Sequence, residues 1–144
     1  DKTYDFVWNI GAIEHYEHDL VIDLLTEMLR VTDNGGYIGI AIPNFKSFAI
    51  KKAMLLAHPQ LKSLLSFIPG YRLDTEKLYS AKNIEDMLKA AANSNGIELE
   101  DIKTLYIGSS LFVETPKFLI KFYSKIEKYF NKRNFLILTL AKRK

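Results

Sequence analysis

Two side chains that can exchange protons, Glu14 and His15, follow shortly after an apolar run near the start of the sequence. That run, residues 4–10, is rich in aromatic and β-branched residues and is closed by Gly11, which predicts a buried strand. Ligands of open α/β sheets bind beyond the carboxyl ends of parallel strands. An imidazole at such a place can accept a proton from a substrate hydroxyl. We therefore expect His15 to act as a general base or to orient a substrate, with simple packing against the next helix as the alternative.

Two other polar residues near the predicted strand ends, Glu14 and Asn44, each allow two interpretations. Glu14 could bond the backbone or a substrate hydroxyl, or it could be an exposed loop carboxylate. Asn44 follows Pro43 after a second apolar run and could donate a hydrogen bond to substrate, although Pro-Asn is also ordinary turn chemistry. His15 and His18 stand among acidic residues, but their spacing gives no convincing ligand set, and we expect no metal site.

The two apolar runs are joined by a helical pattern. Leu20, Leu24 and Met28 recur at helical spacing after Asp19, a fair N-cap, and the pattern ends at Asn34-Gly35-Gly36. The second run, residues 37–42, then predicts another buried strand. A strand, a helix of about 14 residues and a strand form a βαβ unit, in which the two strands are parallel.

Residues 45–80 form an insertion that carries much apolar surface. Phe45 to Ala57 is expected to be helical, and Pro59 suits the first turn of another short helix. Because the insertion follows the carboxyl end of a strand, it is a natural lid over a substrate. A helical pair that completes the core, or a dimer contact, is the alternative.

The rest of the chain predicts a helix, a strand, a helix and a strand. Ser80 can cap a helix that stops at Asn95-Gly96, strand candidates lie around residues 102–107 and 134–142, and Pro116 opens a helix to about Asn131. In that helix a basic stripe stands opposite an apolar face that we expect to be buried. The stripe, at about 100° per residue, is Lys117, Lys121, Lys125, Lys128 and Lys132, and the apolar face is Leu119, Phe122, Ile126 and Phe130.

Composition and charge limit the class of protein. The 144 residues are 48% hydrophobic and contain no cysteine, which excludes disulfides and thiolate metal sites and favours a cytoplasmic location. Residues 1–50 carry three basic and eight acidic side chains, whereas residues 51–144 carry seventeen basic and nine acidic ones.

The basic stripe could be a solvated face or could meet an anionic membrane surface. Nucleic acid is not expected, because the aromatic residues lie off the stripe.

The segment from Tyr4 to His15 resembles the fourth strand and following loop of class I, Rossmann-like S-adenosylmethionine-dependent methyltransferases. Glu27-Met28-Leu29-Arg30-Val31, Asn34-Gly35-Gly36-Tyr37 and the strand ending Pro43-Asn44 are similar to the family's next helix, glycine turn and fifth strand, in order. The resemblance is detailed over residues 4–44 and topological beyond. It implies an α/β fold: the C-terminal half of a Rossmann-like methyltransferase sheet, with two parallel strands, an antiparallel pair and a helical insertion.

The same resemblance implies a function for a longer protein. Asn9, Ile10 and Gly11 would line the methionine end of S-adenosylmethionine, and residues 1–144 would be a partial domain that supplies the acceptor side. The family's glycine-rich loop and ribose-binding acidic residue are not in the sequence, so we expect this chain to be inactive alone. The expected acceptor is a small or lipid-like molecule. The alternative is a non-catalytic half-domain that oligomerises through an exposed sheet edge or binds an anionic partner.

Overall fold

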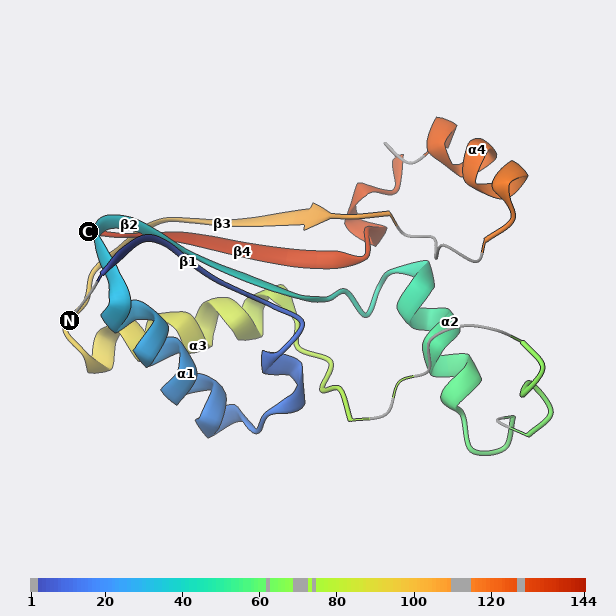
Figure 1. The fold of residues 1–144 in the computed structure, drawn as a ribbon, viewed down its shortest axis with the longest axis horizontal. Helices are drawn as coiled ribbons and strands as arrows, with labels where there is room; N and C mark the ends of the chain where they lie inside the picture. The colour runs from blue at the N-terminus through green and yellow to red at the C-terminus, as the bar shows by residue number, and fades with distance from the viewer. Residues whose placement is uncertain (1–2, 62, 69–72, 74, 110–114, 127–128) are drawn as a thin grey trace.

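Four strands form one sheet in the order β1-β2-β4-β3 (Figure 1). The computed structural model describes residues 3–61, 63–68, 73, 75–109, 115–126 and 129–144. β1 (Tyr4–Ile10) is parallel to β2 (Thr32–Pro43), and β4 (Leu136–Arg143) is antiparallel both to β2 and to β3 (Leu99–Ile107). The predicted parallel pair and antiparallel pair are therefore confirmed, in a sheet whose last strand lies at an inner position.

Two helices cover one face of this sheet (Figure 1). α1 (His18–Val31) connects β1 to β2, and α3 (Ala81–Ser94) precedes β3. Ser80 caps α3 as predicted, in a reciprocal pair of hydrogen bonds with Asn83. The core between the helices and the sheet is made of buried aliphatic side chains: Val21, Leu25 and Leu29 from α1, Ile84, Met87 and Leu88 from α3, and Ile38, Ile40 and Ile42 from β2.

The connection from α1 to β2 is tighter than the sequence predicts. α1 begins at His18, so Asp19 lies inside its first turn, and it ends at Val31, where the Thr32 hydroxyl donates to the Met28 carbonyl at 2.7 Å. β2 starts at once and contains both glycines. A Cβ on Gly36 would lie 2.9 Å from a backbone oxygen, which is why this position needs glycine. The predicted helix stop at the glycine pair is therefore displaced to Thr32.

Among its described residues the insertion contains one regular helix, α2 (Phe48–Ala57), capped by the Ser47 hydroxyl, which accepts from the Ile50 amide at 3.1 Å. The second short helix predicted after Pro59 is wrong, because the described residues between 59 and 67 form turns. Leu64 and Phe67 are 69% and 77% exposed there. Without a buried face, a segment this short gains too little from packing to hold a helix.

α4 (Lys117–Ile126) and the short η3 turn (Asn131–Arg133) stand at the same end of the molecule as α2, away from both termini (Figure 1). Tyr123 is buried and meets the Phe48 ring edge-on, with ring centroids 6.2 Å apart. The expectation of a buried apolar face is wrong for three of its four members, since Leu119, Phe122 and Phe130 are 43%, 63% and 39% exposed. Residues 127 and 128, near the end of the helix predicted from Pro116, lie outside the described residues. No helix of the described chain is long and apolar enough to cross a bilayer.

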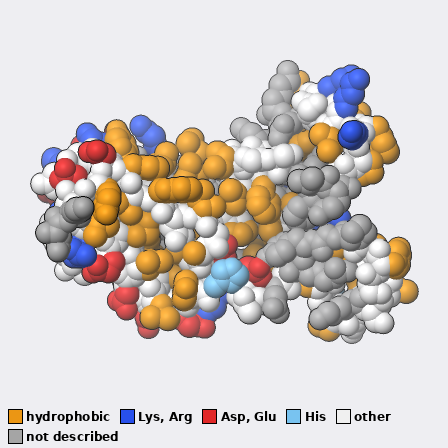
Figure 2. Space-filling model, in the orientation of Figure 1, with side chains coloured by type: hydrophobic (Ala, Val, Ile, Leu, Met, Phe, Trp, Pro, Cys, Tyr) orange, Lys and Arg blue, Asp and Glu red, His pale blue; other side chains and the backbone are white. Residues whose placement is uncertain are grey.

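The face of the sheet opposite α1 and α3 carries hydrophobic side chains, and no helix of the described chain covers it (Figures 1 and 2). Alternate residues of β1 point to it, because successive side chains of a strand point to opposite faces. Its exposed members are Tyr4, Phe6, Trp8 and Ile10 of β1, Tyr37 of β2 and Leu105 of β3. In the described chain β1 is also paired on one side only. A contiguous apolar face with an open edge is typical of a sheet that other elements cover.

Candidate functional site

In the loop after β1 the acidic residue Glu14 is buried, and the next residue, His15, is exposed. Gly11 adopts φ +67° and donates its amide to the Ala41 carbonyl at 3.1 Å, which ends the strand. The 3-10 turn η1 (Ile13–His15) follows, and the fully buried Ile13 fixes it on the core. This anchoring makes Glu14 a buried residue and His15 an exposed one at the carboxyl end of β1.

Glu14 is a carboxyl group held out of water. Its side chain is 3% exposed, its Oε1 lies beside Gly11, and its Oε2 has no hydrogen-bond partner within the part of the chain that is described. Burial raises the pKa of Glu14, since desolvation disfavours the charged form; its backbone hydrogen bond and His15 oppose the shift, and Glu76 adds to it. The predicted alternative of an exposed loop carboxylate is therefore wrong. A buried oxygen in need of a donor fits an incoming hydroxyl or ammonium group.

The side chain of His15, in the loop after β1, contacts the C-terminal part of the insertion. Its Nδ1 lies 2.9 Å from the Thr75 hydroxyl oxygen. In the tautomer that donates from Nδ1, the ring keeps an acceptor lone pair on Nε2. The ring is thus oriented by a neighbour 60 residues away and exposed to a ligand, as a general base requires.

The segment that returns from the insertion lies along the whole loop after β1. The Lys77 amide donates to the Glu14 carbonyl at 2.7 Å, the Lys77 ammonium pairs with Glu17, and the Tyr79 hydroxyl donates to the Tyr16 carbonyl at 3.0 Å. Sequence reasoning missed these contacts. They join positions about sixty residues apart, and no local pattern marks them.

Asn9, Ile10 and Gly11 occupy the strand end that the resemblance assigns to the cofactor, but they do not share a face. Asn9 points to the helical side, where its buried Oδ1 has no partner among the described residues, and it lines a cavity of about 320 Å³ with Tyr16, Leu20 and Leu24. Ile10 points to the uncovered face. Asn9 is thus a second buried acceptor oxygen at the end of β1.

Asn44 is fully buried and its polar atoms are used within the chain. Both hydrogens of its Nδ2 are donated, to the Lys132 carbonyl at 3.1 Å and the Asn134 carbonyl at 2.7 Å, and its Oδ1 accepts from the Lys46 amide at 3.0 Å. No donor is left for a ligand. The structure therefore gives Asn44 the role of connecting the end of β2 to the segment before β4, and we correct the predicted substrate contact accordingly.

An apolar cavity of about 500 Å³ opens in the insertion. It lies between Phe45, just beyond the end of β2, the outer side of α2, and Leu78 of the returning segment. Its other lining residues are Lys51, Met54, Leu55 and His58. The insertion thus provides an apolar surface with two basic groups near the strand ends. No three potential metal-ligating side chains gather anywhere in the described ranges.

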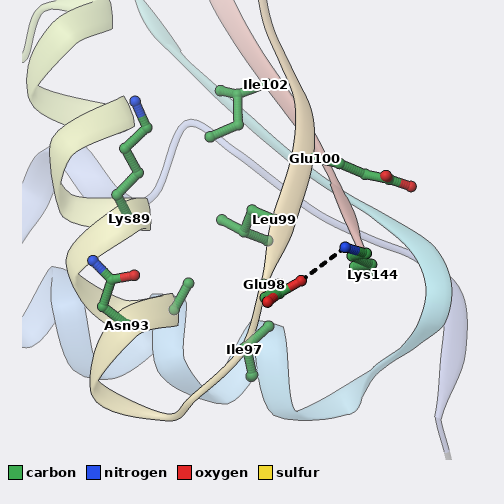
Figure 3. Close-up of a pocket in the computed structure, with 9 residues that line it drawn as sticks. Lys89, Asn93, Ile97, Glu98, Leu99, Glu100, Ile102 and Lys144 are labelled. Atoms are coloured by element: carbon green, nitrogen blue, oxygen red, sulfur yellow. Dashed lines mark ion pairs between the residues drawn. The ribbon is translucent and has the colours of Figure 1, made fainter.

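Another cavity, of about 410 Å³, lies between α3 and β3 (Figure 3). This part of the fold is at the end of the molecule where the termini lie (Figure 1). Each of the cavity's charged residues is already in an ion pair: Lys144 pairs with Glu98 at 3.0 Å within the cavity, and Lys89 and Glu100 pair with Glu85 and Lys142 outside it. It is far from the carboxyl ends of the parallel strands, where sheets of this kind place their ligands. We therefore assign the candidate site to the loop after β1.

Solved structures share this arrangement of strands and helices. A SAM-dependent methyltransferase from Archaeoglobus fulgidus matches 99% of the chain at 15% identity with a TM-score of 0.55. A SAM-dependent methyltransferase from Thermotoga maritima, described as a possible histamine N-methyltransferase, matches 99% at 16% identity with a TM-score of 0.52. The fold is that of the class I methyltransferases.

The chain matches only part of each of these proteins, 60% of the first and 56% of the second. No family model matches the sequence, and no curated protein matches it. The similarity between this chain and these two proteins is therefore a similarity of fold.

Proposed function

We propose that the chain is the acceptor-side half of an S-adenosylmethionine-dependent methyltransferase. The observation that carries the proposal is the pair of buried acceptor oxygens, Asn9 Oδ1 and Glu14 Oε2, that have no partner among the described residues at the carboxyl end of β1. Each such atom costs free energy unless a donor reaches it. On a methyltransferase fold, this is where a ligand with an amino or hydroxyl group would supply the donor.

The residues present fit one end of the cofactor. Asn9 and Gly11 would hold the methionine part, where a charged amino group matches an acceptor oxygen and the glycine adds no side chain. Bound there, S-adenosylmethionine supplies a methyl group on an activated sulfonium. The glycine-rich loop and the acidic residue that would hold the rest of it are not in this sequence. The proposal therefore places cofactor binding in a longer chain and inactivity in this fragment.

We propose that His15 accepts the proton that the substrate loses when it is methylated. A hydroxyl or amine loses a proton when it is methylated, and the exposed His15 ring, oriented by Thr75, can take it on Nε2. The apolar cavity of the insertion supports a hydrophobic acceptor, with residues 45–80 as its lid. The chain itself mainly aligns the reactants and excludes water.

Calorimetric titration of S-adenosylmethionine tests this function. The longest natural chain that contains residues 1–144 should bind it, and residues 1–144 alone should not. Asn9→Ala should weaken binding about tenfold, the effect of one lost hydrogen bond to a charged group. His15→Ala should lower methyl transfer and leave binding unchanged, and His18→Ala, an exposed neighbour, should change neither. No binding by the longer chain would refute the proposal.

The uncovered sheet face favours a second candidate, a non-catalytic half-domain that associates with another chain. Six large apolar side chains are exposed on that face, and the edge of β1 beside them is open in the described chain. Sedimentation distinguishes the two candidates, because the module requires a stable oligomer with no response to the cofactor. The cytoplasmic location predicted from the cysteine-free sequence belongs to both proposals, and cell fractionation would test it.

A further inference from the structure

α4 carries two adjacent rows of exposed side chains, one basic and one aromatic. Lys117, Lys121 and Lys125 recur every fourth residue, and Phe118 and Phe122 each follow a lysine by one position. Residues four apart lie on one face of a helix, so the two rows run side by side. Phe118 is 70% exposed and Phe122 is 63% exposed. These five residues are called the α4 surface below.

The rotation of α4 about its axis is fixed by Tyr123. Its ring is the buried side chain of the helix and packs edge-on against Phe48. At about 100° per residue, Phe122 and Phe118 lie about 100° and 140° around the helix from Tyr123. The two phenylalanine rings therefore point away from the protein. Figure 2 shows basic and hydrophobic side chains gathered over α4, at the end of the molecule farthest from the termini.

Among the described residues, the lysines of this surface have no acidic partner. Residues 117–126 include no acidic side chain, and no described carboxylate pairs with the three lysines. In α3, by contrast, Lys82 and Lys89 are each paired with a carboxylate one turn away. The α4 surface therefore offers a row of free positive charge next to a row of aromatic rings.

We propose that the α4 surface docks the chain on an anionic lipid bilayer. Rings at this exposure can enter the boundary between headgroups and acyl chains, while lysine stems extend their ammonium groups to lipid phosphates. A second copy of the chain is a poorer partner, since a symmetric contact through this surface would bring lysines against lysines. A nucleic acid would engage the lysines and leave the outward rings in water. The proposal is independent of the methyl-transfer function.

Co-sedimentation of residues 1–144 with vesicles tests the docking. We expect binding to vesicles of phosphatidylcholine with phosphatidylglycerol, little binding to phosphatidylcholine alone, and loss of binding as salt is raised. Replacing Lys117, Lys121 and Lys125 by Gln should lower the partition coefficient by on the order of a hundredfold, since each basic residue near the surface contributes about fivefold. Phe118→Ser and Phe122→Ser should each lower it about tenfold.

Matched controls separate this surface from others. Lys82→Gln, Lys89→Gln and Lys103→Gln together remove the same charge from the opposite part of the chain and should leave binding unchanged. Leu105→Ser removes an exposed apolar side chain from the uncovered sheet face and should also have no effect. Phe122→Trp keeps an aromatic ring and should retain or strengthen binding. This variant tests the role of the ring at position 122 even if the serine variants fold poorly.

Several outcomes would overturn the docking proposal. Equal binding to neutral and anionic vesicles would remove the role of the lysines. An equal loss in the triple lysine control, or in Leu105→Ser, would place the contact elsewhere. Binding to duplex RNA that needs the lysines but not the rings, without binding to vesicles, would identify a nucleic acid as the partner.

Discussion

Replacing Asn44 by Ala should unfold the chain more readily and should do so without any ligand present. Asn44 is fully buried, and its amide makes three hydrogen bonds at 2.7, 3.0 and 3.1 Å. The substitution leaves two carbonyls and one amide without their partner. It also removes the Asn44 side-chain bonds between the end of β2 and the residues that lead into β4, and leaves the backbone bond from the residue 44 amide to the Phe135 carbonyl.

The size of the effect follows from the number of groups left unsatisfied. A net hydrogen bond contributes about 1 kcal/mol, and a buried group without a partner costs about 1–3 kcal/mol. The Lys132 and Asn134 bonds are only partly buried, so water can replace some of what is lost. We therefore expect a decrease of about 3 kcal/mol in the free energy of unfolding, on the order of a hundredfold in the folding equilibrium.

Urea unfolding followed by circular dichroism measures this decrease. Asn93→Ala is the matched control, an exposed asparagine on α3 whose loss should change stability by less than about 0.5 kcal/mol. If Asn44→Ala were as stable as the unsubstituted chain but bound S-adenosylmethionine or methyl acceptor less well in the longer protein, the structural role would be refuted. The substrate contact predicted from the sequence would then stand.

Three further substitutions test separate parts of the fold, each by urea unfolding. Burial raises the Glu14 pKa above its ordinary value of 4.5, so the folded chain loses stability as pH rises through and beyond 4.5; Glu14→Gln should be more stable at neutral pH and equal below pH 4.5. Gly36→Ala places a Cβ 2.9 Å from the Asp33 carbonyl oxygen and should cost about 1–3 kcal/mol; an unchanged midpoint would contradict this crowding. Ser80→Ala breaks the capping box with Asn83 and should cost about 1 kcal/mol, whereas Ser80→Thr should keep most of it.

Much of the fold is local enough to be predicted from the sequence. The runs at residues 4–10 and 37–42 match β1 and the inner part of β2, because short stretches rich in aromatic and β-branched residues favour strands. The expectation that both strands are buried holds only for β2. Every residue of β1 is exposed or half-buried, since β1 is an edge strand of the described sheet and one of its faces is uncovered. Ser80 and Asn95-Gly96 mark the ends of α3 correctly, since caps act within one turn. Where neighbours along the chain decide the conformation, the sequence is sufficient.

The site was less predictable, because distant residues decide its geometry. Asn9 and Glu14 lie at the expected strand end, but nothing local reveals that their oxygens are buried without described partners. Asn44 was misjudged for the same reason, since the carbonyls that occupy its amide lie 88 and 90 residues away. The exposure of Phe122 follows from Tyr123 packing on Phe48 of another helix, which a helical pattern alone cannot show.

The inner position of β4 has a consequence for how this sheet is made. β2 and β3 do not pair with each other; both pair with β4, which follows them in the sequence. During synthesis β3 therefore has no described strand to join until β4 has left the ribosome, and the β2–β4 pairs that complete the sheet join residues 93 to 105 positions apart. Arg143, near the end of β4, also donates to the carbonyls of Leu29 and Thr32 at the end of α1. Such high contact order predicts slow folding, with the apolar faces of β2 and β3 open to chaperones for as long as β4 is missing.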